Sequence, residues 1–287
     1  MLQKQHGARV LVLGASGKVG RLVRAVWEAA GEGLTVVPVV RRDSGLEGQV
    51  IWSPGAPLDG LPHVDVVLAL WGVCPGPGGD LAANSALALS AAEIARATGA
   101  DRVLHCSSAA VYAPGPEPLS EDMTPRPPSA YGVAKLEMEL ALADDMARHP
   151  QGPRAVWLRI GNVAGADSLF GAMMRSGDVH LDRFDDGAGP ERSYIAPSDL
   201  AHVLARLATV PTSDLPARLN LAAPLPTAME AIARAAGRRV IWCHAPAGAV
   251  RRVALDTTRL TTLCPLQPET ARPEHLVSDW MRYKGVQ

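Results

Sequence analysis

Aromatic residues are scarce in this chain of 287 residues, at 4% of the total, and the net charge is close to zero. The 28 Lys and Arg residues against 29 Asp and Glu residues give a formal charge of −1. Single-stranded nucleic acid is commonly bound by stacking on aromatic side chains, and phosphate backbones or anionic membranes by an excess of positive charge. We therefore expect neither nucleic acid nor a membrane as a partner.

Cysteines are also few, and none is part of a CxxC pair. The four are Cys74, Cys106, Cys243 and Cys264. Neither a zinc site nor a disulfide framework is predicted, and because the histidines show no HExxH spacing, we expect no metal. The longest apolar stretch, around residues 66–74, is far too short to span a bilayer, and the beginning of the sequence has no apolar secretory segment. These features predict a cytoplasmic protein with reduced thiols.

Hydrophobic residues make up 47% of the chain, enough for a sizeable core. Apolar runs typical of buried strands cover residues 8–13, 34–40, 49–52, 64–71, 102–106 and 155–160. Segments with helical spacing alternate with them, at residues 19–30, 81–97 and 129–148. This alternation predicts an α/β protein with a parallel sheet covered on both faces. Right-handed crossovers make it a doubly wound sheet, the Rossmann fold.

The alternation ends after residue 160. Shorter elements follow, with a loop expected at 182–190 and helices near 197–208, 227–236 and 273–283. The sequence thus predicts a first part, residues 1–160, that contains the sheet. Residues 161–287 are expected to form mostly a smaller C-terminal lobe, with some pieces returning to the sheet.

A glycine-rich turn joins the first strand to the first helix and reads Gly14-Ala-Ser-Gly17-Lys-Val-Gly20. Glycines in this context allow a tight turn and let backbone N–H groups approach a pyrophosphate at the helix N-terminus. The turn predicts that residues 1–160 bind a dinucleotide, NAD(P). The residues expected to contact this cofactor here and at the end of the fourth strand are Gly14, Ser16, Gly17, Lys18, Val19, Gly20, Leu70 and Trp71.

The end of the second strand predicts which form of the cofactor is bound. Arg41 and Arg42 come first after the strand, followed by Asp43. A basic residue here accommodates the 2′-phosphate of NADP, whereas an acid would bind the free 2′-hydroxyl of NAD. We expect NADP(H) to be favoured, with NAD(H) as the alternative if Asp43 reaches the ribose. A solvated charge cluster at the end of a strand is the purely structural interpretation.

Tyr131 and Lys135 lie four residues apart, so both project from one face of the predicted helix. A neighbouring ammonium can stabilise a phenolate, and lowering the pKa of a tyrosine by ~3 units takes about 4 kcal/mol. Ser107 and Ser108 follow the fifth strand, at the carboxyl edge where open α/β sheets place their active sites. A serine hydroxyl there could hold a substrate oxygen beside Tyr131.

These residues resemble the extended short-chain dehydrogenase/reductases, also called NAD-dependent epimerase/dehydratases. GASGKVG is similar to the GxxGxxG loop of that family, and Tyr131 to Lys135 to its YxxxK motif. Alignment of the serine segment on Val111-Tyr112 makes Ser108 the matching serine. Residues 158–165 and 192–201 are similar to the family's LRxxNxxG and RDYIHVxDLA segments.

The resemblance implies a role for each residue. Tyr131 exchanges a proton with the substrate, Lys135 holds the nicotinamide ribose, and Ser108 orients the oxygen at the reacting carbon. Asn162 and Arg192 match positions that often contact substrate, although each could instead serve the loop structure. Asn84, where the family often has an asparagine, could equally be a surface amide.

The function expected from these features is NAD(P)-dependent hydride transfer at a hydroxyl or carbonyl carbon of a small-molecule or sugar-like substrate. Two alternatives remain: a redox-neutral nucleotide-sugar epimerase or dehydratase that retains its cofactor, and a cofactor-binding regulator without turnover. Departures from the family pattern, such as Ser193 and Ala196 in the RDYIHV segment, weigh against a UDP-sugar substrate. The family often pairs two helices of each subunit, which here predicts a homodimer through residues 81–97 and 129–148.

Overall fold

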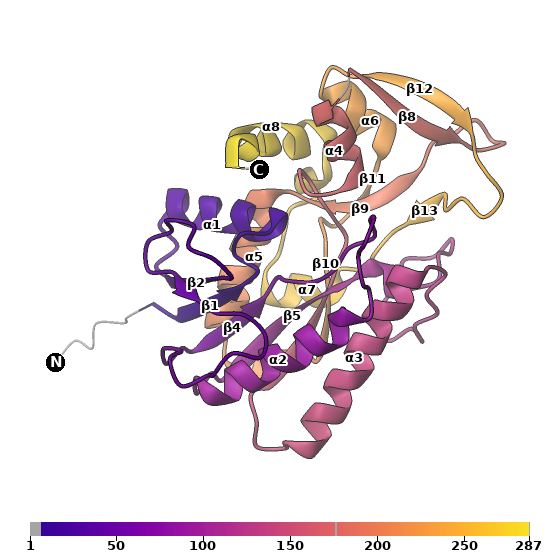
Figure 1. Ribbon diagram of the computed structural model, residues 1–287. Coiled ribbons are helices and arrows are strands. Elements are labelled where there is room, and N and C mark those ends of the chain that lie inside the picture. Colours follow the sequence, from indigo (N-terminus) through magenta and orange to yellow (C-terminus); the bar gives the residue numbers. More distant parts are fainter. Residues whose placement is uncertain (1–6, 176, 287) are drawn as a thin grey trace.

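The computed structural model describes residues 7–175 and 177–286, and its centre is a seven-stranded parallel sheet (Figure 1). The strand order is β10-β6-β5-β4-β1-β2-β3. The strands are β1 (Arg9–Leu13), β2 (Thr35–Val40), β3 (Val50–Ile51), β4 (Val66–Ala69), β5 (Arg102–Ser108), β6 (Arg154–Ile160) and β10 (Arg218–Leu221). Every neighbouring pair is parallel. The predicted doubly wound sheet is confirmed, and β10 is a piece of the C-terminal half that returns to it.

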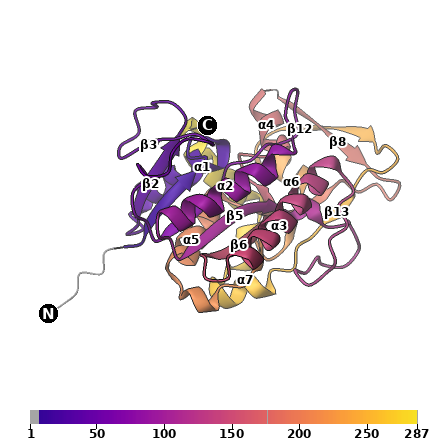
Figure 2. The ribbon, with the colours of Figure 1, turned by 60° about the horizontal axis from the view of Figure 1, so that its bottom comes forward.

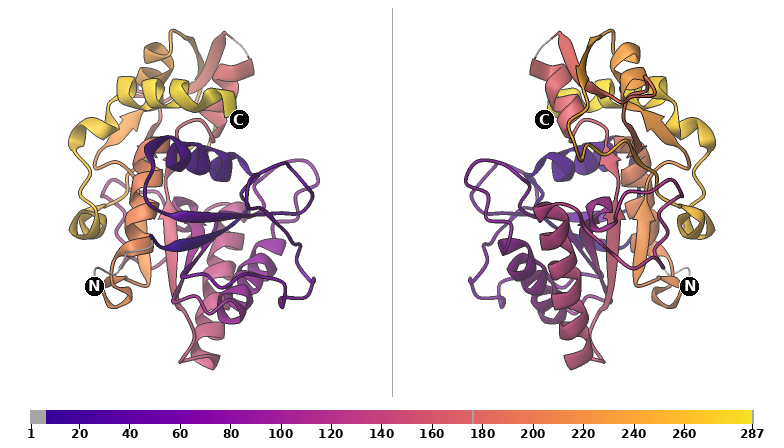
Figure 3. Two further views of the ribbon diagram at one scale, coloured as in Figure 1. Left: turned by 90° about the vertical axis from the view of Figure 1, so that its left-hand side faces the viewer. Right: turned by 90° about the vertical axis from the view of Figure 1, so that its right-hand side faces the viewer.

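Helices cover both faces of the sheet, as Figures 2 and 3 show. One face carries α1 (Lys18–Ala30) and α5 (Pro197–Thr209), which are joined where Trp27 Nε1 donates a hydrogen bond to the Ala201 carbonyl at 2.8 Å. The other carries α2 (Ala83–Ala97) and α3 (Ala130–Arg148), which pack against each other. Alternate residues of each strand serve the two faces; in β1, Val10 and Val12 join one core, and Leu11 and Leu13 the other.

The C-terminal lobe lies beyond the carboxyl edge of the sheet and has its own core (Figure 1). Its helices are α4 (Ser168–Arg175), α6 (Met229–Ala235) and α8 (Pro273–Tyr283). Its strands are β7 (Asn162–Val163), β8 (Asp178–Arg183), β9 (Glu191–Ile195), β11 (Pro226–Ala228), β12 (Arg239–His244) and β13 (Arg252–Val253). Phe170 meets Trp280 edge-on, with ring centroids 5.0 Å apart, so that α4 is tied to α8. A short helix, α7 (Thr258–Leu263), lies against β10.

One loop predicted from the sequence is partly wrong. Residues 182–190 were expected to be irregular, but β8 continues through Arg183 and pairs in parallel with β12. Asp182 and Arg183 at the end of β8 are charged and not buried, so this part of the strand lacks the apolar character that marks a buried strand. In the described ranges no helix has both the length and the apolarity needed to cross a bilayer.

Candidate active site

The glycine turn between β1 and α1 has the geometry that a dinucleotide needs. Gly14 has φ +82°, and a side chain there would come within 2.6 Å of the Trp71 backbone nitrogen. A side chain at Gly20 would overlap the Gly14 carbonyl oxygen. Only glycine fits these two positions without strain. They bring the turn against the end of β4, where Leu70 N–H donates to the Leu13 carbonyl at 2.9 Å.

The N-terminus of α1 is open at this turn. Gly17 is the N-cap and provides no side-chain cap, so the first N–H groups of the helix can donate hydrogen bonds to a phosphate. Ser16, Gly17 and Lys18 are exposed, and Val19 is half-buried. The structure therefore gathers the predicted turn residues together with Leu70 and Trp71, and their cradle fits the pyrophosphate of a dinucleotide.

Arg41 and Arg42 follow directly after the last residue of β2, and both are exposed. Asp43 is turned back on its own loop, where it accepts hydrogen bonds from Gly45 N–H at 2.9 Å and from the Gln49 amide. The Gly45 bond first, and the Gln49 bond second, lower the pKa of Asp43. In this arrangement the carboxylate has partners on its own loop, and the two guanidinium groups precede it at the edge of the sheet where the adenosine ribose is expected.

Ser108 ends β5 and begins a short turn of 3-10 helix, residues Ala109–Val111. Its Oγ accepts a hydrogen bond from Ala110 N–H at 3.1 Å, which fixes the side chain and leaves the hydroxyl proton free to point elsewhere. Gly132, the residue after Tyr131, lets α3 press against this turn, because a side chain there would overlap the Ala110 carbonyl oxygen. The glycine of the Tyr-Gly-Val-Ala-Lys motif thus brings the helix of Tyr131 against the turn of Ser108, a role that the sequence analysis did not assign.

Lys135 is buried beneath Tyr131. Its ammonium lies 5.9 Å from the centre of the Tyr131 ring and donates a hydrogen bond to the Cys106 carbonyl at 2.9 Å. A side chain at Gly72 would come within 3.2 Å of Lys135 Nζ and 3.0 Å of Asn84 Oδ1, so both side chains would have to shift by a few tenths of an ångström to admit it. The amide of Asn84, which is 1% exposed, accepts from Val73 N–H and donates to its carbonyl, both at 3.1 Å. The Asn84 side chain is therefore buried and holds this loop in place through its hydrogen bonds to Val73. Its interpretation as a surface amide is wrong.

The pKa of Tyr131 departs from the sequence expectation. Lys135 was expected to lower it, but the structure raises the pKa of Tyr131 well above its usual value. Burial is the main cause, followed by the neighbouring thiols of Cys106 and Cys74, whereas the interaction with Ser108 acts in the opposite direction. The phenol in this structure is protonated at neutral pH, as it would be at its ordinary pKa. No sequence motif connects either thiol with Tyr131. The one indication that Cys106 lies near the site is its position directly before Ser107-Ser108.

A cavity of about 350 Å³ opens beside Ser108 and Tyr131. Asn162 and Arg192 line it too, and most of its wall is apolar, formed by Ala109, Ala110, Pro114, Pro128, Ile160, Val250 and Val253. Four of the five polar residues predicted for catalysis and substrate binding, on β5, α3, β7 and β9, thus line one cavity; the fifth, Lys135, does not line it.

Asn162 and Arg192 both have protein partners. The Asn162 amide donates to the Asp167 carboxylate at 2.8 Å. The Arg192 guanidinium donates to the carbonyls of Glu191, Arg251 and Val250, at 2.8, 3.0 and 2.7 Å. Each residue therefore stabilises the wall of the cavity, and a substrate would meet groups that are already oriented.

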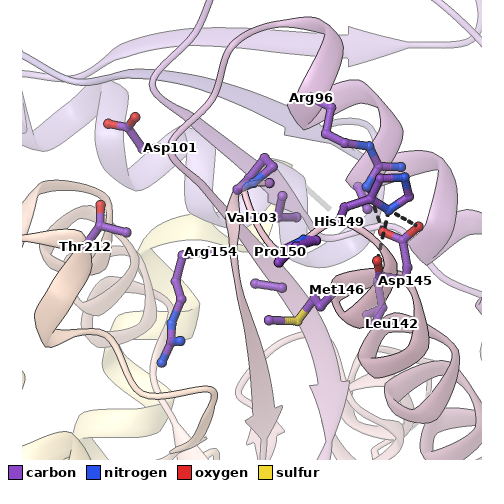
Figure 4. Close-up of a pocket in the computed structure, with 14 residues that line it drawn as sticks. Arg96, Asp101, Val103, Leu142, Asp145, Met146, His149, Pro150, Arg154 and Thr212 are labelled. Carbon is purple, nitrogen blue, oxygen red and sulfur yellow. Dashed lines mark hydrogen bonds and ion pairs between the residues drawn. The ribbon is translucent and has the colours of Figure 1, made fainter.

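A second cavity, of about 250 Å³, lies at the opposite end of α2 and α3 (Figure 4). Arg96 and Asp145 form an ion pair there at 2.7 Å, and His149 also contacts Asp145. Asp145 is 14 residues after Tyr131, which corresponds to roughly 21 Å of helix. This cavity is therefore remote from Ser108 and Tyr131.

Comparisons with known proteins show which proteins this chain resembles. A UDP-glucose 4-epimerase from Corynebacterium glutamicum is 30% identical over 189 residues, which cover 60% of this chain and 56% of that protein. The structure of MoeE5 in complex with UDP-glucuronic acid and NAD is 25% identical, with a TM-score of 0.78 and coverage of 96% of this chain and 99% of that one. A UDP-glucuronic acid 4-epimerase from Bacillus cereus shares the fold at 18% identity, with a TM-score of 0.76 and coverage of 97% and 100%.

The sequence model described as the NAD dependent epimerase/dehydratase family matches residues 58–222. The match includes β4, β5, β6 and β10 together with Ser108, Tyr131 and Lys135. It covers more than half of the 287 residues, and the chain belongs to the NAD dependent epimerase/dehydratase family.

Proposed function

We propose that this protein is an NAD(P)-dependent oxidoreductase that acts at a hydroxyl or carbonyl carbon, with Ser108, Tyr131 and Lys135 as its catalytic residues. The observation that carries the proposal is their convergence. Ser108 and Tyr131 line one cavity, and the buried Lys135 ammonium lies 5.9 Å from the Tyr131 ring. A phenol, a hydroxyl and an ammonium at one site can transfer a proton to an oxygen and stabilise the charge that develops there.

Each side chain has a distinct task in this proposal. The nicotinamide cofactor, when bound, supplies or accepts the hydride. Tyr131, whose phenol is protonated at neutral pH, donates its proton to the carbonyl oxygen of the substrate. Ser108 donates a hydrogen bond to the same oxygen and orients it. Lys135 holds the ribose of the cofactor and favours the phenolate that remains on Tyr131 after proton transfer.

The substrate is a small-molecule or sugar-like compound that enters the cavity lined by Asn162 and Arg192. Arg192 supplies the positive charge on this wall, and it suits a carboxylate or a phosphate. The C-terminal lobe, within residues 161–287, supplies Asn162, Arg192, Val250 and Val253 to the cavity, which supports a division into a cofactor-binding part and a substrate-binding lobe.

NADP(H) is the favoured cofactor in this proposal. Arg41 and Arg42 are exposed immediately after β2, and Asp43 is engaged with Gly45 and Gln49. Two charge-assisted hydrogen bonds to a 2′-phosphate contribute about 1.5–3 kcal/mol each, which is more than a tenfold preference. MoeE5 and the Bacillus cereus epimerase are both described in complex with NAD, so the preference for NADP(H) rests on the two arginines of this chain alone.

Redox-neutral epimerisation or dehydration of a nucleotide sugar is the second candidate. The relative named UDP-glucose 4-epimerase, and the UDP-glucuronic acid bound in MoeE5, favour it. A cofactor-binding regulator without turnover ranks below both, because Ser108, Tyr131 and Lys135 are all present around the cavity.

A panel assay tests the proposal and separates the candidates. Purified protein is given NADPH or NADH with aldehydes, ketones, UDP-glucose or UDP-glucuronic acid, and absorbance is followed at 340 nm while products are separated by chromatography. Consumption of NADPH with a carbonyl compound supports the oxidoreductase. Conversion of a UDP-sugar with no net change at 340 nm supports the epimerase or dehydratase, and binding of cofactor with no conversion of any compound supports the regulator.

The proposal also includes a cytoplasmic homodimer. All four cysteines are free, which favours a reducing compartment. Cell fractionation tests this localisation.

Helices α2 and α3 lie side by side on one face of the sheet (Figures 1 and 2), and Val133 and Leu140 of α3 are exposed there, at 42% and 58%. Apolar residues on an outer helix face support a two-fold contact between copies.

A further inference from the structure

A buried ion pair lies between α3 and β6, one helical turn beyond Lys135. Arg159 donates to both oxygens of the Glu139 carboxylate, from Nε at 3.0 Å and from a terminal nitrogen at 2.6 Å. The two residues are 1% and 5% exposed. Burial lowers the pKa of Arg159, but its hydrogen bonds and charge interaction with Glu139 outweigh this effect, and the net direction is upward. A two-pronged contact of this kind fixes α3 against the sheet in one position.

The same carboxylate also holds the strand that carries the serine. Ser107, which directly precedes Ser108, donates its hydroxyl to Glu139 Oε1 at 2.6 Å. On the other side of Ser107, the Cys106 carbonyl accepts the bond from Lys135 at 2.9 Å. Two consecutive residues of β5 are therefore bound to two side chains one turn apart on α3, immediately before Ser108.

The network continues to β10. Arg159 donates to the hydroxyl of Tyr112 at 2.9 Å, and that hydroxyl donates to Asn220 Oδ1 at 2.8 Å. Asn220 in turn donates to the carbonyls of Leu119 and Asp256, at 2.8 and 2.9 Å. The Glu139 carboxylate thus joins β5, β6 and α3. The side chains connected to it, those of Ser107, Arg159, Tyr112 and Asn220, all form hydrogen bonds.

We propose that Ser107 and Glu139 are positioning residues for the reaction: their hydrogen bond sets the placement of Ser108 relative to Tyr131 and Lys135. The proposal rests on the proposed function of those three residues. Neither Ser107 nor Glu139 lines the cavity. Their effect on the chemistry passes through the ends of β5 and α3, because the Ser108 hydroxyl and the Tyr131 phenol must meet one substrate oxygen within a fraction of an ångström, with the Lys135 ammonium beside the phenol.

The chain offers a matched control on the same helix. Asp145 forms an ion pair with Arg96 at 2.7 Å, and its side chain is 9% exposed (Figure 4). It joins α3 to α2 rather than to β5, at the end of the helix remote from Tyr131. Asp145→Asn therefore breaks another ion pair of α3, one that includes no hydrogen bond to the strand of Ser108.

The experiment compares Ser107→Ala, Glu139→Gln, Asp145→Asn and Tyr131→Phe with the wild type, with the carbonyl compound reduced fastest in the panel and NADPH. Ser107→Ala keeps the ion pair of Glu139 with Arg159 and so covers the case in which Glu139→Gln fails to fold. Thermal midpoint, kcat, KM and the pH profile of kcat are measured for each folded variant. We expect Ser107→Ala to lower kcat by about ten- to a hundredfold at an unchanged KM, and Asp145→Asn to lower the thermal midpoint but not kcat.

The pH profile separates positioning from stability. Glu139→Gln removes a negative charge from the vicinity of Lys135, so the phenolate of Tyr131 is favoured and the alkaline limb of the profile moves to lower pH. In Asp145→Asn that limb stays in place. Wild-type kcat and an unmoved limb in Ser107→Ala and Glu139→Gln, with Tyr131→Phe inactive, would overturn the positioning role alone. Wild-type kcat in Tyr131→Phe would overturn the proposed function itself.

Discussion

The ammonium of Lys135 lies 5.9 Å from the centre of the Tyr131 ring and is held by the Cys106 carbonyl at 2.9 Å. Residues four apart on α3 are expected to share a face, but the bond to β5 is what orients this lysine. Burial nevertheless dominates the pKa of Tyr131 and raises it. The phenol therefore stays protonated at neutral pH, and the following predictions test the surroundings of the pair.

Replacing Gly72 by alanine should disturb Lys135 directly. The added Cβ would lie 3.2 Å from Lys135 Nζ and 3.0 Å from Asn84 Oδ1, closer than ordinary packing allows. We expect weaker binding of NADP(H) and a lower kcat, each by roughly tenfold, which corresponds to about 1.4 kcal/mol. Gly76→Ala, on the same loop but with no atom within 4 Å of the new Cβ, is the matched control for calorimetric titration and kinetics. Equal losses in both variants would mean that only loop flexibility matters.

His105 should control stability in acid. It is buried with an unpartnered Nε2, and burial first, then the charge of Lys135, lower its pKa to about 3. A depressed pKa means that stability present above the unfolded value of 6.5 is lost as the pH falls from there towards 3. Between pH 7 and 4.5 this amounts to about 3 kcal/mol. We expect His105→Leu to lose less stability over this interval in urea unfolding, whereas exposed His244→Gln should behave like the wild type. An unchanged acid dependence in His105→Leu would exclude His105 as the cause.

The double variant Arg41→Ala/Arg42→Ala should lose the preference for NADP(H). We expect its affinity for NADP(H) to fall by more than tenfold, while its affinity for NAD(H) changes little, because no 2′-phosphate is involved. Calorimetric titration of both cofactors measures this. Tighter binding of NAD(H) than of NADP(H) by the wild type would assign the ribose contact to Asp43 instead.

Leu140→Arg should dissociate the proposed homodimer. Leu140 is 58% exposed on α3, and a charge there would be buried without a partner in a two-fold contact of α2 and α3. Light scattering at micromolar concentration is expected to show a dimer for the wild type and a monomer for the variant. Met281→Arg, at an exposed apolar residue of α8, is the control and should leave the dimer intact. A monomeric wild type would contradict the prediction.

Most of the sheet and its helices could be predicted from the sequence, because buried parallel strands and amphipathic helices leave clear periodic patterns. Helix α8 was predicted with the bounds observed, Pro273–Tyr283, since Pro273 marks its first turn. The short strands of the C-terminal lobe were missed. β7 has only two residues, too few for a recognisable pattern, and the four apolar residues of β12, 240–243, are half-buried or exposed and lie between charged or polar ones.

The residues of the candidate site that belong to local sequence motifs could be predicted. Properties that depend on burial and on contacts between distant segments could not. The motifs led to Gly14, Ser108, Tyr131 and Lys135, and the fold brings the last three together. The raised pKa of Tyr131 could not be predicted, because it depends on desolvation and on Cys74 and Cys106 from other segments. Glu139 had one signal, its position four residues after Lys135 on the helix, but its partners Ser107 and Arg159 come from β5 and β6.

The most direct test of the central claim is the NADPH turnover of Tyr131→Phe with the best carbonyl substrate of the panel, followed at 340 nm beside calorimetric titration of NADPH. Phenylalanine keeps the ring above Lys135 and removes only the hydroxyl that donates the proton. We predict that kcat falls by two or more orders of magnitude while the affinity for NADPH stays within about threefold of the wild type. A kcat near that of the wild type, with cofactor binding intact, would contradict the assignment of Tyr131 as the proton donor.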